Sequence, residues 1–70
     1  MFFRVHVVIN GDPQQLSDGL TIAGLVVQLG FSERRIAVEV NREIIAREHY
    51  GAHTLADGDQ VEIVHFVGGG

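Results

Sequence analysis

The chain has 70 residues, a formal net charge of −4, nine glycines, no cysteine and no lysine. A chain of this length forms one small domain, which buries only about 60% of its unfolded surface and therefore has a thin core. The lack of cysteine excludes a disulfide framework, a thiolate zinc site, an iron–sulfur site and a cysteine nucleophile. The acidic balance disfavours nucleic acid and anionic membranes as partners and favours a partner with a basic face.

The hydrophobic content of 46% is high enough for a folded core and argues against disorder. No apolar run approaches the roughly 20 residues of a membrane span. No signal peptide is recognisable, so the cytoplasm is the expected location. Because a deep catalytic cleft is not expected in so small a domain, the composition favours a binding or carrier module.

The N-terminal segment predicts a β-hairpin. Residues 2–9 (FFRVHVVI) are aromatic and β-branched, which is typical of a strand. Asn10-Gly11 is a strong hairpin signal, and residues 14–17 are predicted to form the returning strand. Strand alternation places one set of side chains on the inner face, namely Phe3, Val5, Val7 and Ile9.

A helix is predicted over residues 22–29, with Thr21 as its N-cap and Gly30 at its C′ position. Leu20 and Leu25 have the spacing of a hydrophobic staple. Gly24 inside the helix weakens it by about 1 kcal/mol relative to alanine. The apolar stripe that faces the core is predicted to comprise Ile22, Leu25, Val26 and Leu29.

The C-terminal half predicts three more strands, with an irregular segment at 47–55. The Asn41-Arg42 pair fits a tight turn, and Asp57-Gly58-Asp59 forms another. One helix among strands indicates an α+β fold of order ββαβββ, with a mixed sheet and the helix packed on one face. The domain is expected over residues 1–67, followed by a flexible glycine tail at 68–70. The three strands are predicted at residues 36–40, 43–46 and 60–67.

The tail Gly68-Gly69-Gly70 is the most informative feature of the sequence. One interpretation is a frayed end or a cloning remnant. The other is functional, because residues without a Cβ atom can thread a narrow channel and leave the last carbonyl open to attack. Three extended residues reach about 10 Å, enough to place Gly70 inside the active site of a partner enzyme. Adenylation of the carboxylate would provide a leaving group, and sulfide would then convert it to a nucleophilic thiocarboxylate.

The element order and the glycine tail resemble ubiquitin-like β-grasp proteins, and among them the ThiS family of sulfur carriers in thiamin thiazole biosynthesis. Three segments carry the resemblance: Asn10-Gly11 in the first turn, residues 41–50 (NREIIAREHY), which look like N-x-x-(I/V)-(I/V)-P-R-x-x-(W/Y), and residues 55–63 (LADGDQVEI), which match L-x-D-G-D-x-(I/V)-(E/L)-I. Two features depart from the family pattern. Ala46 replaces the usual proline, and the tail has three glycines where the family usually has two.

The resemblance implies that Gly70 is the covalent carrier site. An E1-like adenylyltransferase would adenylate it with ATP, and a cysteine desulfurase or a rhodanese-like protein would supply the sulfur. The resulting thiocarboxylate would donate sulfur to thiazole synthase. The carrier itself would catalyse nothing and bind no cofactor. The alternatives are the small subunit of molybdopterin synthase, a protein modifier that forms isopeptide bonds, and a β-grasp interaction module with incidental glycines.

A partner-binding surface is expected on the sheet face opposite the helix. Alternation places Arg4, His6, Val8, Ala37, Glu39, Glu62, Val64 and Phe66 there. Val64 and Phe66 are apolar where a solvated face would be polar, which suggests a docking site beside the tail. The alternative is that they pack on neighbouring loops. The predicted partner-binding residues are Arg4, Val8, Glu62, Val64 and Phe66.

Structural roles are expected for the remaining polar residues. Arg47 is predicted to bond loop carbonyls or to pair with Asp57 or Asp59, both of which are natural turn formers. His49 and His53 have helical metal-ligand spacing, but Gly51 lies between them and no carboxylate completes a site. No metal is therefore expected. His65 is predicted at the edge of the core.

Overall fold

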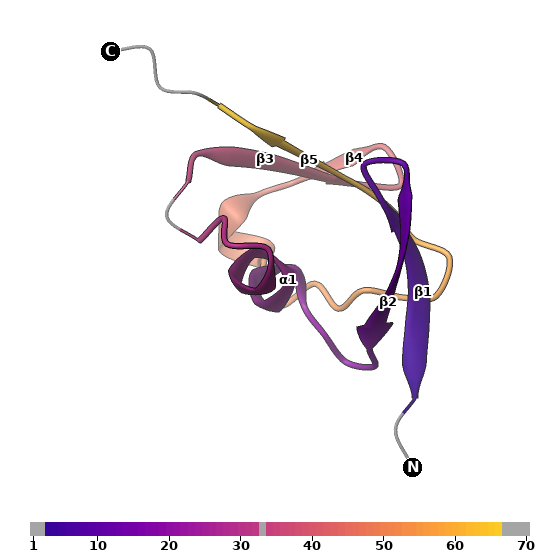
Figure 1. Cartoon of the computed structure of the whole chain (residues 1–70). Helices are drawn as coiled ribbons and strands as arrows, with labels where there is room; N and C mark the ends of the chain where they lie inside the picture. Colours follow the sequence, from indigo (N-terminus) through magenta and orange to yellow (C-terminus); the bar gives the residue numbers. More distant parts are fainter. Residues whose placement is uncertain (1–2, 33, 67–70) are drawn as a thin grey trace.

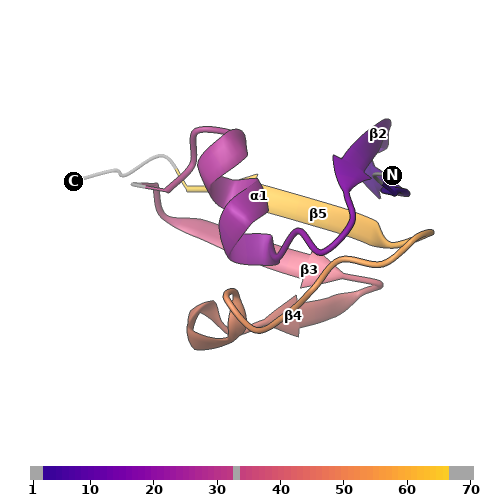
Figure 2. The same ribbon diagram turned by 90° about the horizontal axis from the view of Figure 1, so that it is seen from below.

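The computed structural model describes residues 3–32 and 34–66, which form one curved five-stranded sheet with a single helix against its concave face (Figures 1 and 2). The predicted α+β fold of order ββαβββ is confirmed, and a short 3-10 helix precedes the last strand. The elements are β1 (Arg4–Ile9), β2 (Asp12–Ser17), α1 (Ile22–Gln28), β3 (Ile36–Val40), β4 (Glu43–Ile45), η1 (Arg47–His49) and β5 (Gln60–His65).

The sheet has the order β2-β1-β5-β3-β4, so the last strand lies in its centre. β5 pairs parallel with β1 and antiparallel with β3, and the two hairpins complete the sheet on either side. β2 starts two residues earlier than predicted and includes Pro13. Proline is acceptable there because β2 is an edge strand, which leaves its outer side without a ladder partner.

Both hairpins turn through two residues with positive φ. Asn10 and Gly11 have φ of 51° and 81°, and Asn41 and Arg42 have φ of 51° and 70°. Two consecutive left-handed residues are the signature of the type I′ turn, whose twist matches that of the flanking strands. Asparagine accepts this conformation more readily than most residues, while Arg42 occupies it at a conformational cost.

The two turn asparagines also hold the central strand. The Asn10 side chain donates to the Ile63 carbonyl at 3.1 Å and accepts from the Ile63 N–H at 2.8 Å. The Asn41 side-chain oxygen accepts from the Gln60 N–H at 3.0 Å, and the Asn41 side-chain amide donates to Asp59 Oδ1 at 3.0 Å. Each hairpin turn is therefore tied to β5 by a side chain that continues the ladder of backbone hydrogen bonds.

The caps of α1 agree with the sequence prediction. The Thr21 hydroxyl accepts from the Gly24 N–H at 3.1 Å, and Gly30 has φ of 79°. At the C-terminal end, the Gly30 N–H donates to the Val27 carbonyl and the Phe31 N–H donates to the Val26 carbonyl. This pair of bonds is a Schellman motif, which requires a left-handed residue at the position of Gly30.

Gly24 has a packing role that its helix propensity does not reveal. Leu20 Cδ1 lies 2.6 Å from where a Cβ on residue 24 would be. Leu20 is half-buried against the core, so it packs over the glycine before the chain enters the helix. The missing side chain at position 24 therefore allows the segment before the helix to lie close to it.

The core lies between α1 and the concave face of the sheet, and most of the predicted inner-face residues are buried in it. Two predictions were wrong. Phe3 is 66% exposed and precedes β1, which begins only at Arg4, and Leu29 is 41% exposed because it is already the C-cap. The irregular segment contributes two core side chains that alternation could not predict, Tyr50 and Leu55. The core comprises Val5, Val7, Ile9, Leu16, Ile22, Leu25, Val26, Val38, Val40, Tyr50, Leu55, Val61 and Ile63.

The remaining differences concern the ends of strands. β4 ends at Ile45, because Ala46 is the extended N-cap of η1 and not the last strand residue. β5 ends at His65, and the predicted Val67 lies outside the described residues. Among the described residues, no helix combines the length and the apolar character that crossing a membrane requires.

Candidate functional site

The predicted carrier site and tail, Gly68, Gly69 and Gly70, lie outside the described residues. The structure does show where the chain leaves the domain. Phe66 follows β5 directly, and its N–H donates to the Arg35 carbonyl at 2.8 Å. The segment that leads to the tail therefore departs from the central strand, at the end of the sheet where β3 begins.

An apolar area lies on the convex face of the sheet, close to this point of departure. Val64 is 50% exposed and Phe66 is 56% exposed, so neither is covered by a neighbouring loop. Ala37 is the direct cross-strand neighbour of Val64 on this face. Ile44, which sequence reasoning did not single out, is 76% exposed. The exposure of Ile44 could have been predicted from strand alternation in β4. Ile45 packs against the core, so its neighbour Ile44 must point outward.

Two carboxylates face each other in the same area. Glu39 of β3 is paired with Glu62 of β5 on one side and with Ile44 of β4 on the other. Like charges directly opposite each other across strands are destabilising. This row of residues therefore offers both exposed apolar surface and concentrated negative charge, which suits a partner with apolar and basic groups.

The five predicted partner-binding residues do not form one patch. Glu62 and Val64 lie in a row along β5, and Phe66 follows the end of that strand. Val8 is half-buried and lies beside Gln60, at the opposite end of β5. Arg4 lies four residues further back along β1, so the parallel register places it far from Phe66.

A small polar cluster occupies the other end of this face. Asp57 Oδ1 accepts from the backbone N–H of His6 at 2.7 Å and lies 3.3 Å from His6 Nδ1. The other ring nitrogen of His6 lies 3.2 Å from the Gln15 side-chain nitrogen. The backbone hydrogen bond from His6, with a smaller contribution from its ring, lowers the pKa of Asp57 below its ordinary 3.8. Asp57 thus joins the last turn to β1.

The lowered pKa of Asp57 predicts a loss of stability in acid. A carboxyl group whose pKa is lower in the folded state adds stability that is complete above its unfolded pKa and disappears as the pH falls through the folded value. The urea midpoint of the Asp57→Asn variant is therefore expected to fall less than that of the wild type as the pH drops below 3.8. The exposed Asp18→Asn variant serves as the control. Parallel curves for wild type and Asp57→Asn would contradict this role.

Asp59 also acts as a turn former, as predicted, while Arg47 does not pair as predicted. Asp59 accepts from the Ala56 N–H at 2.8 Å and from the Asn41 amide at 3.0 Å. Within residues 3–32 and 34–66, the only ion pair is His6–Asp57, and no hydrogen bond involves the Arg47 side chain. Arg47 lies on η1, where it lines a cavity together with residues of α1.

The histidines show no metal-binding arrangement. Within the described ranges, no three residues among histidine, aspartate and glutamate are grouped closely enough to hold an ion. The ring of His65 stacks on that of Phe31 at a centroid distance of 5.5 Å, which places it at the edge of the core as expected.

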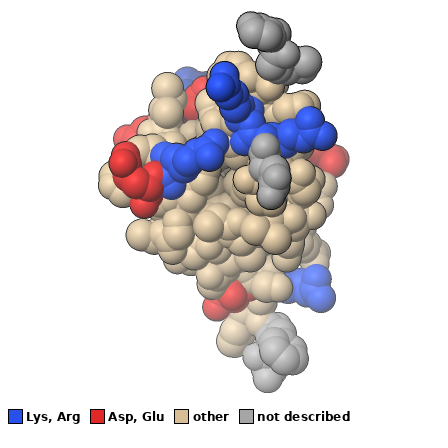
Figure 3. All heavy atoms as spheres, turned by 90° about the vertical axis from the view of Figure 1, so that its left-hand side faces the viewer, with Lys and Arg blue, Asp and Glu red and all other residues tan. Residues whose placement is uncertain are grey.

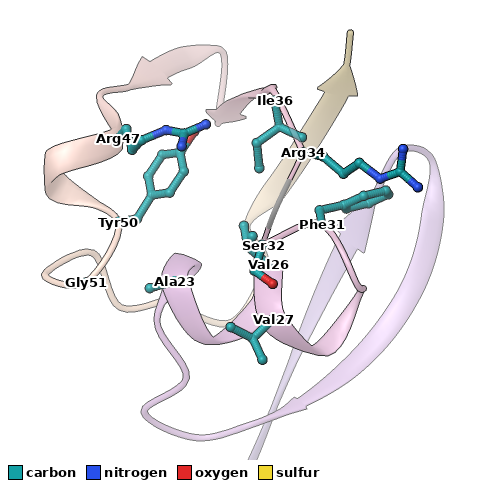
Figure 4. Close-up of a pocket in the computed structure, with 10 residues that line it drawn as sticks. All are labelled: Ala23, Val26, Val27, Phe31, Ser32, Arg34, Ile36, Arg47, Tyr50 and Gly51. Carbon is teal, nitrogen blue, oxygen red and sulfur yellow. The ribbon is translucent and has the colours of Figure 1, made fainter. Parts of the chain in front are cut away.

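A cavity of about 310 Å³ opens on the helix side of the sheet (Figure 4). Its walls come from α1, from the segment that follows α1, and from η1 with the residues after it. Its lining is mostly apolar, and two arginines stand at its rim, Arg34 and Arg47. Sequence reasoning missed this cavity because its walls come from segments separated by up to 28 positions, from Ala23 to Gly51. The lining residues are Ala23, Val26, Val27, Phe31, Ser32, Arg34, Ile36, Arg47, Tyr50 and Gly51.

Comparisons with known proteins agree with this fold. Residues 7–70 match the model of the ThiS family. A sulfur carrier protein ThiS of Bacillus subtilis is 43% identical over 63 residues, which cover 89% of this chain and 96% of that protein. The crystal structure of a thiamine biosynthesis protein (ThiS) from Geobacter metallireducens superimposes with a TM-score of 0.79 at 34% identity, covering 94% of this chain and all (100%) of that one.

Other relatives are much longer. A protein of Magnetococcus marinus named thiazole synthase is 45% identical over 67 residues, and one of Paramagnetospirillum magneticum with the same name is 42% identical over 66 residues. The chain spans only 20% of the length of each. The family match nevertheless extends over almost the whole sequence, including its three last glycines. The chain therefore belongs to the ThiS family.

Proposed function

We propose that this chain carries sulfur for the formation of the thiamin thiazole, as a thiocarboxylate on Gly70. The observation that carries this proposal is membership of the ThiS family, with a match that runs through residue 70. Relatives named sulfur carrier protein ThiS and thiazole synthase both support it. The alternatives of a molybdopterin synthase subunit or a protein modifier have no comparable support.

The proposed chemistry takes place in two steps on the Gly70 carboxylate. One carboxylate oxygen attacks the α-phosphorus of ATP, pyrophosphate leaves, and an acyl adenylate forms. Hydrosulfide, released by a thiol reductant from the persulfide of a cysteine desulfurase or a rhodanese-like donor, then displaces AMP. The C–S bond forms as the C–O bond to AMP breaks, and the thiocarboxylate remains. The product is anionic and nucleophilic at neutral pH, so it attacks without a general base. An E1-like adenylyltransferase would catalyse the activation, and thiazole synthase would accept the sulfur.

The intact mass of the protein tests this proposal. After incubation with an E1-like adenylyltransferase, Mg²⁺-ATP and a sulfur donor, the C-terminal peptide is expected to show one oxygen replaced by sulfur. Omission of ATP should leave the carboxylate unchanged. A persistent carboxylate under the complete conditions would overturn the carrier function, and attachment to lysines of other proteins would point to a modifier.

The convex face around β5 is the proposed docking surface for these enzymes, with Val64, Phe66 and Glu62 at its centre. Ile44 extends the apolar area, and Glu39 adds a second carboxylate. Exposed apolar area beside a reactive tail is the pattern of a binding surface. Arg4 and Val8 would contact a partner only if it covered the sheet from end to end, because β1 places them far from Phe66.

Replacement of Phe66 by aspartate is expected to weaken binding of the carrier to its partner enzymes by at least tenfold. An aromatic side chain that becomes buried in an interface commonly contributes about 2 kcal/mol or more to the binding free energy. The matched control is Phe3→Asp, because Phe3 is similarly exposed, at 66%, but lies beyond the opposite end of the sheet. Both variants should keep the circular-dichroism spectrum of the wild type. Equal kinetics for the two variants, or loss of the folded spectrum in Phe66→Asp, would contradict the role of Phe66.

Replacement of Glu62 by glutamine is expected to have opposite effects on stability and on binding. Removal of one charge from the Glu39–Glu62 pair relieves repulsion, so the free energy of unfolding should rise by about 0.2–1 kcal/mol. Association with the activating enzyme should slow, and the difference from the wild type should shrink as salt is added. Urea denaturation measures the free energy of unfolding, and stopped-flow binding measures the association rate. A gain in stability without any change in the association rate would show that the Glu39–Glu62 pair takes no part in docking.

A further inference from the structure

We propose that the cavity between α1 and η1 is a second docking site, which binds a partner segment that presents one bulky apolar side chain flanked by carboxylates. The site lies on the helix side of the sheet, whereas the proposed carrier function uses the convex face. This second site does not depend on the chemistry of Gly70, so a failure of the carrier proposal would not affect it.

The first argument is the shape and lining of the cavity. Its volume of about 310 Å³ is at the lower limit of the roughly 300–1,000 Å³ of small-molecule pockets. Val26 and Tyr50 are buried in its walls, and Phe31 and Ile36 are half-buried. An open apolar hollow of this size suits one large side chain, which would remove the surrounding apolar surface from water.

The second argument is the charge at the rim. Arg34 and Arg47 come from different segments, both are exposed, and Figure 4 shows them on opposite sides of the opening. Among the described residues, no carboxylate oxygen lies within 4.0 Å of either guanidinium. Figure 3 shows arginine side chains gathered over the upper part of this side of the molecule, with acidic side chains beside them at its left edge. The two charged residues that line the cavity are both positive, in a chain whose net charge is −4.

The third argument concerns the backbone near the cavity. Val26 and Val27 bring the C-terminal half of α1 to the wall, and the carbonyl end of a helix repels anions. Ala23 lies in the first turn, but its N–H already donates to the Tyr50 carbonyl at 3.0 Å. A free phosphate or nucleotide would thus find two arginines but no cradle of backbone N–H groups. A peptide segment suits the cavity better, because its carboxylates would remain at the rim while its apolar side chain fills the floor. Exposed arginines bind carboxylates through two parallel hydrogen bonds.

Titration of the isotope-labelled full chain with the peptide acetyl-Asp-Asp-Phe-Glu-Glu-amide tests the site by NMR. Amide shifts are expected at residues 23–36 and 47–51 and not on the convex face. A peptide with asparagine and glutamine in place of its acids, and one with alanine in place of its phenylalanine, should each bind at least fivefold more weakly. Shifts centred on Val64, equal affinity for the neutral peptide, or stronger shifts at the same amides with AMP would overturn the proposal.

Matched variants separate binding from folding. The Arg34→Gln/Arg47→Gln double variant is expected to weaken peptide binding by about fivefold, since each exposed ion pair contributes up to about 1 kcal/mol. Arg42→Gln, at the β3–β4 turn, should leave the affinity unchanged. Val27→Asp places a carboxylate on the lip of the cavity and should abolish binding, while Val64→Asp should not, and both positions are at least half exposed. Unchanged binding by Val27→Asp, or equal losses in the two aspartate variants, would refute the site.

Discussion

Replacement of Ile22 by alanine is expected to lower the free energy of unfolding by about 3 kcal/mol. Ile22 is fully buried, with 0% of its surface exposed, at the first turn of the only α-helix among the described residues. Its N–H also donates to the His53 carbonyl at 3.0 Å, so helix and irregular segment meet at this residue. The missing side-chain atoms would leave a cavity between α1 and the sheet that neither layer can close easily.

This loss is large for so small a domain, whose stability is expected near the lower end of the usual range of about 5–15 kcal/mol. Chemical denaturation followed by far-ultraviolet circular dichroism measures it. Val27→Ala is the matched control, because it also replaces a β-branched residue on the same helix but at a position that is 65% exposed. It should change the unfolding free energy by no more than about 0.5 kcal/mol. Alanine has a higher helix propensity than either residue, so similar losses in both variants would contradict core packing at Ile22 as the cause.

Deletion of Gly70 is expected to abolish thiocarboxylate formation while the fold remains intact. The deletion withdraws the terminal carboxylate by one residue, about 3.3–3.6 Å along an extended chain. A displacement of even 1 Å between reacting groups can cost a factor of about 100 in rate, so the shortened tail should place the carboxylate out of reach of ATP. The expected result is an unmodified mass with an unchanged circular-dichroism spectrum and urea midpoint.

Addition of one glycine after residue 70 is the companion variant, because it keeps the composition of the tail and changes only its length. If position matters as proposed, the longer chain should also react more slowly than the wild type. Normal thiocarboxylate formation after deletion of Gly70 would show that the activating enzyme tolerates different tail lengths. The proposal that Gly70 itself is the carrier residue at a fixed depth would then be wrong.

The elements with local signals were predictable from the sequence. Thr21 and Gly30 mark the two ends of α1, and the Asn-Gly and Asn-Arg pairs mark both hairpins. Each signal depends on the conformational preference of one or two residues. Residues 36–40 alternate, and the strand is confirmed with the predicted bounds. Alternation predicted the inner face correctly within β1, where Val5, Val7 and Ile9 are buried, and it was wrong at Phe3, which lies before the strand.

The functional surfaces depend on contacts that the sequence does not display. The exposed Ile44 lies in one row with Glu39 and Glu62 only because β4 and β5 both flank β3. The separation of Arg4 from Phe66 follows from the parallel register of β1 and β5, which no local pattern specifies. Arg47 and Tyr50 belong to the segment that carries the family resemblance, yet their place at a cavity beside α1 emerges only when η1 packs under the helix.

The central position of β5 has a mechanical consequence. When a partner enzyme holds the residues beyond Phe66 and the body of the domain is pulled away, the force acts along the axis of β5. The strand can then slide out only if its hydrogen bonds to β1 and β3 break together, in shear, along with the side-chain bonds from Asn10 and Asn41. An edge strand in the same place would unzip one bond at a time. The topology thus attaches the segment that partner enzymes are proposed to hold to the strand that best resists being pulled from the sheet.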